Sequence, residues 1–167
     1  MESGRKRYIW QMVNIGLLVL WMGVIFMFSS RTAIQSQRES SYITKRIVNM
    51  ISISREVSWT MEEKIEITDS IDFYVRKAAH MSEYTLLGLL LMNVFTSFKI
   101  HLKSAGYYAF PLGIVYAISD EIHQYFVPGR ACQVRDMAID GIGVLIGIAL
   151  FTACFKIGCK IISSKVK

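Results

Sequence analysis

Residues 8–28 read YIWQMVNIGLLVLWMGVIFMF, a run without a formal charge. At about 1.5 Å per residue, such a run is long enough to cross the roughly 30 Å hydrocarbon core of a bilayer as one helix. Arg5, Lys6 and Arg7 precede it, so a secretory signal peptide is the alternative interpretation. Because the run exceeds the apolar part of a signal peptide and no A-x-A cleavage pattern follows, we expect a retained transmembrane helix.

Three further apolar runs follow, at residues 78–98, 105–126 and 137–157. Pro111, in the run at residues 105–126, can be accommodated in a membrane helix by local adjustment of the backbone. Hydrophobic residues make up 53% of the 167-residue chain, which is too apolar for an ordinary soluble domain and too short for several domains. The predicted fold class is all-α: a single polytopic membrane helix bundle over residues 1–167, with four transmembrane helices at about 8–28, 78–98, 105–126 and 137–157.

Residues 29–76 separate the first two apolar runs and mix acidic with basic residues. The stretch contains no Gly or Pro, and its pieces 42–53 and 61–73 have an amphipathic pattern. Amphipathic helices of this kind lie in the membrane interface. We therefore expect short interfacial helices in this first outer loop rather than a flexible linker.

Basic residues cluster beside the apolar runs, at Arg5 to Arg7, at Lys99 to Lys103 and in the last residues of the chain. Short segments rich in Lys and Arg resist translocation, which predicts that both termini lie in the cytoplasm and the first loop outside. This distribution accounts for the formal net charge of +6 without a nucleic-acid partner, and none is expected.

Ionisable residues are concentrated at one end of the apolar runs. Each charge inside a membrane helix costs about 2.5–3.5 kcal/mol on insertion scales, so such residues pair, line a cavity or take part in chemistry. At the start of the second run, Arg76, His80 and Glu83 fall on one helical stripe, with Lys77 beside them.

The third and fourth runs carry polar residues at the matching end. Near the end of the third run one face carries Tyr116, Asp120, His123 and Gln124, with Glu121 on its flank. The turn Val127-Pro128-Gly129-Arg130 follows, and the fourth run opens with Asp136 and Asp140 aligned above Gly143 and Gly147. The glycines would let another helix approach closely and draw the acids toward the bundle. Under the four-span topology these three helix ends meet on the extracytoplasmic side.

Three other interpretations of this cluster stay open. It could be a structural network in which Arg76 and Arg130 pair with the buried acids. The pairs His80-x-x-Glu83 and Asp120-x-x-His123 are also typical of helix-borne metal ligands, but the nearby Arg and Lys disfavour a cation. Proton or ion translocation is disfavoured because the other half of each run is apolar. Three cysteines, Cys132, Cys154 and Cys159, form neither a CxxC pair nor a disulfide framework.

The segments RKAAHMSEYTLLG at residues 76–88 and DEIHQYFVPGR at residues 120–130, followed by Asp136, resemble the VanZ-like family. The resemblance extends to Phe28-Ser29-Ser30 and the serines after it, and covers most of the chain. Asp140 departs from it, since the family pattern usually has Asn there. Members of the VanZ-like family are small bacterial membrane proteins, and the family is named for a member associated with low-level resistance to teicoplanin. The resemblance implies a location in the bacterial cell membrane and a cell-envelope role.

The resulting hypothesis is an outward-facing polar site that binds, or also modifies, an anionic lipid-linked or cell-envelope component, with effects on glycopeptide susceptibility. The expected partners are membrane lipids, a lipid-linked envelope precursor or a glycopeptide-related ligand, and neither a metal nor a cofactor is expected. The alternative is a non-catalytic membrane interaction protein with a structural ion-pair network. The candidate catalytic residues are His80, Glu83, Asp120 and Glu121. The candidate ligand-binding residues are Arg76, Lys77, Tyr84, His123, Gln124, Arg130, Asp136 and Asp140.

Overall fold

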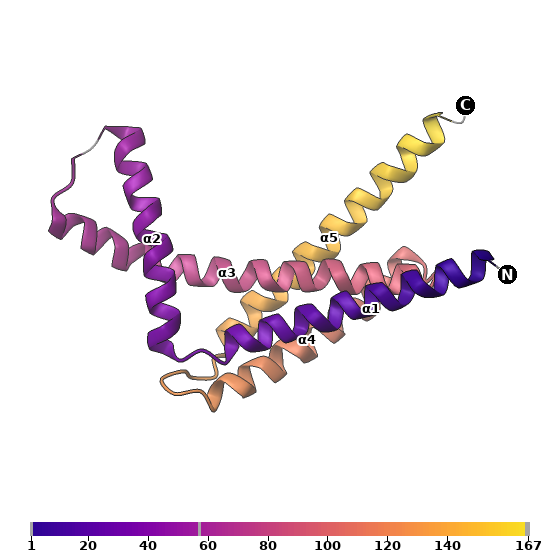
Figure 1. Cartoon of the computed structure of the whole chain (residues 1–167), viewed down its shortest axis with the longest axis horizontal. Helices are drawn as coiled ribbons and strands as arrows, with labels where there is room; N and C mark the ends of the chain where they lie inside the picture. The colour runs from indigo at the N-terminus through magenta and orange to yellow at the C-terminus, as the bar shows by residue number, and fades with distance from the viewer. Residues whose placement is uncertain (1, 57, 166–167) are drawn as a thin grey trace.

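The computed structural model describes residues 2–56 and 58–165, and within these ranges all regular structure is α-helical. The predicted all-α class is therefore confirmed. Five helices follow one another along the chain: α1 (Glu2–Ser29), α2 (Ala33–Arg55), α3 (Met61–Ser97), α4 (Leu102–Tyr125) and α5 (Val134–Lys165) (Figure 1).

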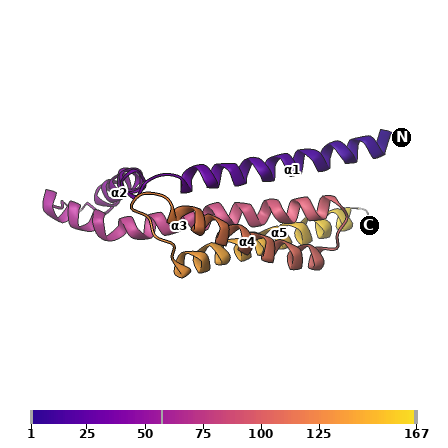
Figure 2. The same ribbon diagram turned by 90° about the horizontal axis from the view of Figure 1, so that it is seen from below.

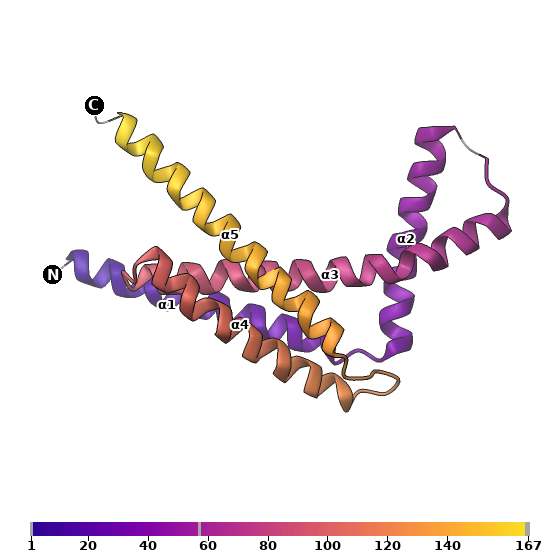
Figure 3. The ribbon, with the colours of Figure 1, turned by 180° about the vertical axis from the view of Figure 1, so that it is seen from behind.

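Helix α3 is the centre of the arrangement, because it contacts each of the other four helices. Its largest interface is with α5, which crosses it obliquely (Figure 3). Figure 2 shows α1 as a separate layer along the group formed by α3, α4 and α5. The buried apolar core draws on all four of these helices: Ile25, Tyr84, Leu87, Leu91, Met92, Ala105, Ala109, Ala117 and Val144.

Glycines bring the backbones of α3 and α5 together. A Cβ atom on Gly143 would lie 2.6 Å from the carbonyl oxygen of Met81, and one on Gly147 would meet the carbonyl oxygen of Thr85. On α3, a Cβ atom on Gly88 would lie 2.5 Å from a backbone oxygen of α5. Side chains on these faces would hold the helices apart. The prediction that the glycines of the fourth apolar run admit another helix is thus confirmed, and that helix is α3.

Residues 29–76 differ from the expectation of short helices. Helix α2 has 23 residues and begins at a capping box formed by Thr32 and Gln35. The expected separate helix at residues 61–73 was wrong, because this piece is the first part of the 37-residue α3. No Gly or Pro interrupts the chain between Met61 and Gly88, so the backbone hydrogen bonds continue from the loop into the apolar run.

Among the residues that the structure describes, two helices are long and apolar enough to cross a membrane by length and composition, over Gly4–Ser29 and Val134–Ser164. The predicted spans at 78–98 and 105–126 fall on α3 and α4, and each extends one residue past the end of its helix. At about 1.5 Å per residue, the 37 residues of α3 measure about 55 Å, well beyond the roughly 30 Å of a hydrocarbon core.

The chain segments flanked by basic residues lie at one end of the molecule. The N-terminus of α1, the turn between α3 and α4, and the C-terminus of α5 point the same way (Figures 1 and 3). The Nε2 of Gln11 donates a hydrogen bond to the carbonyl oxygen of Ser97 over 3.1 Å, which ties the first two of these together. The opposite end holds α2, the last turns of α1 and α4, and the start of α5.

The close approach of α3 and α5 predicts that Gly147→Ala destabilises the protein. The added Cβ atom would overlap backbone atoms of Thr85 and Leu89, and overpacking of this kind costs about 1–3 kcal/mol. We expect a lower melting temperature of the detergent-purified protein, measured by the loss of its monodisperse chromatographic peak after heating. Gly158→Ala in the same helix is the control, because no atom lies within 4 Å of its added Cβ. Equal melting temperatures for the two variants would contradict the proposed role of the crossing.

Candidate functional site

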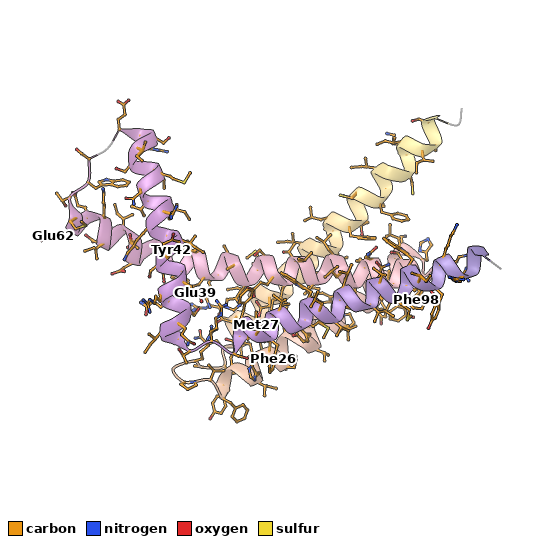
Figure 4. All side chains as sticks on the ribbon, in the orientation of Figure 1. Phe26, Met27, Glu39, Tyr42, Glu62 and Phe98 are labelled. Carbon is orange, nitrogen blue, oxygen red and sulfur yellow. The ribbon has the colours of Figure 1, made fainter. Side chains whose placement is uncertain are left out.

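Two adjoining cavities lie where α2 passes the end of the bundle, and we call them together the polar cleft. Their volumes are about 220 Å³ and about 280 Å³. Ser36, Arg76, His80 and Arg130 line both cavities, so these four residues stand at their junction. Glu39 of α2, labelled in Figure 4, lines the second cavity.

Helix α3 supplies one wall of the polar cleft. Arg76, His80 and Glu83 all line it, as their spacing on one helical stripe predicts. The Nδ1 atom of His80 lies 3.8 Å from a carboxylate oxygen of Glu83. The backbone carbonyl of Glu83 accepts a hydrogen bond from the indole of Trp21 over 3.0 Å, so α1 supports this wall from behind.

Asp72 fixes Arg76 and also docks α2. Its carboxylate is buried and lies 3.5 Å from the Nε of Arg76, one turn further along α3. The hydroxyls of Ser41 and Thr44 on α2 donate to its other oxygen, both over 3.4 Å. Sequence reasoning missed this residue. The i, i+4 spacing of Asp72 and Arg76 could have predicted this ion pair. It does so only if both residues belong to one continuous helix, as they do in α3.

The turn between α4 and α5 supplies Arg130 and is held against the start of α2. Gly129 adopts a positive φ of 77°, a conformation that favours glycine. The backbone N–H of Ala33 donates to the carbonyl oxygen of Pro128 over 3.3 Å. These contacts bring the side chain of the next residue, Arg130, over the cleft.

Arg130 is positioned by neutral groups. Its Nε donates to the carbonyl oxygen of Arg31 over 2.9 Å, and its Nη1 donates to the side-chain oxygen of Gln124 over 3.0 Å. Within residues 2–56 and 58–165, no ion pair joins it to a carboxylate. Burial lowers the pKa of this guanidinium from its ordinary value, although arginine stays protonated in proteins. The cleft therefore holds a positive charge without a direct counter-ion.

The last turns of α1 join the site through a buried hydrogen-bond chain. One carboxylate oxygen of Asp120 accepts from the hydroxyl of Ser29 over 2.8 Å and from the amide of Gln124 over 3.0 Å. The same Gln124 accepts from Arg130, so its amide stands between the cation and the buried acid. All five helices therefore contribute to the site, rather than the predicted three helix ends, and Arg76, His80 and Glu83 lie within α3 rather than at its end. Ser29 belongs to the Phe-Ser-Ser pattern noted in the sequence. The sequence alone does not reveal that its partner is Asp120 on α4.

Two other carboxylates serve mainly to hold the start of α5. Lys77 lies 2.5 Å from Asp136, an ion pair that joins α3 to α5. Glu121 is buried and accepts a hydrogen bond from the backbone N–H of Gln133 over 2.9 Å. Lys77 is therefore already neutralised by a protein carboxylate, unlike Arg130.

The predicted site residues fall into three groups. The polar cleft is lined by Arg76, Lys77, His80, Glu83, Gln124, Arg130 and Asp136. Four others are buried behind it: Tyr84, Asp120, Glu121 and Asp140, with exposed fractions of 0%, 3%, 2% and 2%. His123 faces α1 instead, where its ring stacks on Phe26 with centroids 4.2 Å apart and its Nε2 lies 3.0 Å from the hydroxyl of Ser30. Phe26 is labelled in Figure 4.

The geometry bears on two of the three other interpretations of the cluster, the structural network and the metal site. Arg76 pairs with Asp72 and Arg130 with neutral oxygens, so the described part of the chain does not form the anticipated network between these arginines and the acids of the apolar runs. Among the residues that the structure describes, no group of three or more His, Cys, Asp or Glu could hold a metal ion. The free thiols of Cys132, Cys154 and Cys159 are exposed and form no disulfide.

Comparison with known proteins identifies one relationship. The model of the VanZ/LLP1 family matches residues 14–156, which include all of the polar cleft and the α3–α5 crossing. No curated protein and no solved structure matches the chain.

The buried chain through Asp120 predicts that Ser29→Ala loosens α1 from α4. Removing the hydroxyl leaves a buried carboxylate oxygen with one donor fewer, at a cost of about 1–3 kcal/mol. We expect a lower melting temperature in detergent and faster proteolysis near the junction of α1 and α2. Ser119→Ala is the control, since that hydroxyl is exposed and donates to the carbonyl of Tyr116 in its own helix. A control as unstable as Ser29→Ala would refute the assignment.

Proposed function

The chain belongs to the VanZ/LLP1 family, and we propose that its polar cleft binds the anionic group of a membrane lipid or a lipid-linked cell-envelope component. In this proposal the protein is a bacterial membrane protein whose α1, α3, α4 and α5 all cross the bilayer. Both termini lie in the cytoplasm, and the cleft opens at the outer leaflet.

The topology rests on length, composition and charge. Helices α1 and α5 are apolar over more than the thickness of a bilayer core, and α3 and α4 pack between them through an apolar core. The basic ends of the chain and the Lys99 to Lys103 turn share one end of the bundle. Lysine-rich short segments are retained on the cytoplasmic side, which leaves the polar cleft at the outer face.

The observation that carries the proposal is that Arg130 forms no direct ion pair with a carboxylate in the described part of the chain. Its Nε and Nη1 are used to hold it in place, and Nη2 remains to donate to a ligand. Arg76 lines the same junction and is held through its Nε alone. Guanidinium groups bind phosphate and carboxylate oxygens in paired, charge-assisted hydrogen bonds. Two of them at one junction, with only Arg76 paired to an acid, suit an anionic headgroup.

A second role, modification of the bound component, is favoured by the place of His80. It lines both cavities together with the two arginines, and its Nδ1 lies 3.8 Å from a carboxylate oxygen of Glu83. A histidine oriented by a carboxylate is the usual arrangement of a general base. In this role His80 would accept the proton of an attacking hydroxyl or water while the arginines hold the anionic group. Asp120 and Glu121, predicted as catalytic acids, lie behind the cleft and are not assigned a direct contact with the ligand.

Lipid binding by the cleft predicts that Arg130→Gln weakens the affinity for an anionic phospholipid. A charge-assisted hydrogen bond contributes about 1.5–3 kcal/mol, so the dissociation constant should rise about ten- to a hundredfold. The measurement is titration of purified protein with phosphatidylglycerol, followed by native mass spectrometry. Arg38→Gln removes the same charge from an exposed position of α2 that does not line the cleft, and should change binding less than twofold. Unchanged affinity in Arg130→Gln, or lost abundance without lost binding, would favour the non-catalytic structural alternative.

The cell-envelope role predicts a glycopeptide phenotype. Expression of the protein in a susceptible bacterial host should raise the inhibitory concentration of teicoplanin, and Arg130→Gln should abolish that rise at unchanged membrane abundance. His80→Gln separates the two roles, because it keeps both arginines. Full protection in this variant would mean that lipid binding suffices. Lost protection with retained lipid affinity would mean that His80 takes part in modifying the bound component. The envelope role would be refuted if expression changed no susceptibility and both variants behaved like the parent chain.

A further inference from the structure

A third cavity lies at the opposite end of the molecule, far along the helices from the polar cleft. Its volume is about 700 Å³, within the usual range for ligand pockets. Residues of the turn that joins α3 to α4 line it on one side and residues of α5 on the other. Figures 1 and 3 show that α5 diverges from the bundle toward its C-terminus. We call it the basic groove, and it is lined by Thr96, Lys99, Ile100, His101, Leu102, Lys103, Gly106, Ile148, Thr152, Phe155, Lys156 and Cys159.

The charge of the basic groove has one sign. Lys99, Lys103 and Lys156 line it, and no Asp or Glu is among its lining residues in the described part of the chain. None of these three lysines forms an ion pair within residues 2–56 and 58–165. Lys99 comes from the turn, Lys103 from the first turn of α4 and Lys156 from α5, so segments distant in sequence bring the three lysines to one opening.

The floor and the side wall of the groove are apolar. Ile148 and Phe155 lie one above the other along α5, and Leu102 faces them from the start of α4. Gly106 lines the groove beside Ile148, since a Cβ atom there would lie in van der Waals contact, 3.4 Å from a methyl group of Ile148. Phe155 is 46% exposed, so the wall continues outward onto the lipid-facing surface of α5.

From these features we propose that the basic groove binds one anionic phospholipid, with its phosphate among Lys99, Lys103 and Lys156 and an acyl chain along Ile148 and Phe155. Basic pockets between membrane helices bind anionic headgroups. The apolar wall would contact an acyl chain, which a soluble anion does not have. Under the proposed topology this lipid belongs to the cytoplasmic leaflet. The groove is thus a second lipid site, separate from the polar cleft and in the opposite leaflet.

The test is native mass spectrometry of the full-length protein titrated with dioleoyl phosphatidylglycerol, with dioleoyl phosphatidylcholine as the neutral lipid. The combined variant Lys99→Gln, Lys103→Gln, Lys156→Gln should lose at least tenfold in affinity for one phosphatidylglycerol and leave phosphatidylcholine binding unchanged. The matched control Arg5→Gln, Arg7→Gln, Lys160→Gln removes the same charge from the same end outside the groove, and should lose less than twofold. Gly106→Phe, which keeps all three lysines, should block the same site by filling it.

Three results would overturn the proposal. One is an equal loss in the matched control, which would mean attraction to the whole basic end. Another is binding of soluble glycerol phosphate as tight as that of phosphatidylglycerol, which would mean that the acyl chain does not contribute to the affinity. The third is retained binding in Gly106→Phe at normal stability. Arg130→Gln serves to keep the two sites apart, because it should leave the lipid of the basic groove in place even if the polar cleft binds none.

Discussion

The approach of α5 onto α3 through Gly88, Gly143 and Gly147 is the constraint on which the other contacts depend. Close backbone contact fixes both the crossing point and the register of the two helices. With that register set, Asp136 at the start of α5 reaches Lys77, and the turn before it brings Arg130 over the end of α3. The same oblique crossing carries the far half of α5 away from the bundle, which opens the space that becomes the basic groove.

The electrostatics of the polar cleft follow from which groups neutralise which. Lys77 and Arg76 each have a protein carboxylate, whereas Arg130 has an amide and a carbonyl. Gln124 has a particular part in this arrangement, because its amide donates to Asp120 and accepts from Arg130. A carboxylate in its place would neutralise the cation. An amide instead links the guanidinium to the buried acid through hydrogen bonds and leaves the positive charge of Arg130 in place.

The features that follow from helical periodicity could be read from the sequence. The stripe of Arg76, His80 and Glu83 and the glycines of α5 need only the spacing of residues along one helix, and both are found as predicted. Asp72 and Ser29 were missed because their roles depend on partners in other helices, Thr44 and Asp120, whose proximity no local pattern encodes. The separate helix expected at residues 61–73 was wrong for a related reason. A change from polar to apolar composition indicates a change in the environment of the side chains. It does not mark a helix boundary here, because α3 continues through it.

The length of α3 has a consequence for how the protein would sit in different membranes. An unbroken helix of about 55 Å cannot shorten, so a chain crossing the bilayer as proposed must adapt to a thinner or thicker hydrocarbon layer by tilting or by deforming the lipid around it. Tilt of α3 carries α2 with it, since Asp72 joins the two helices. The height of the cleft mouth above the headgroups is then coupled to bilayer thickness, so the lipid composition of the host membrane helps to set which headgroups lie level with Arg130.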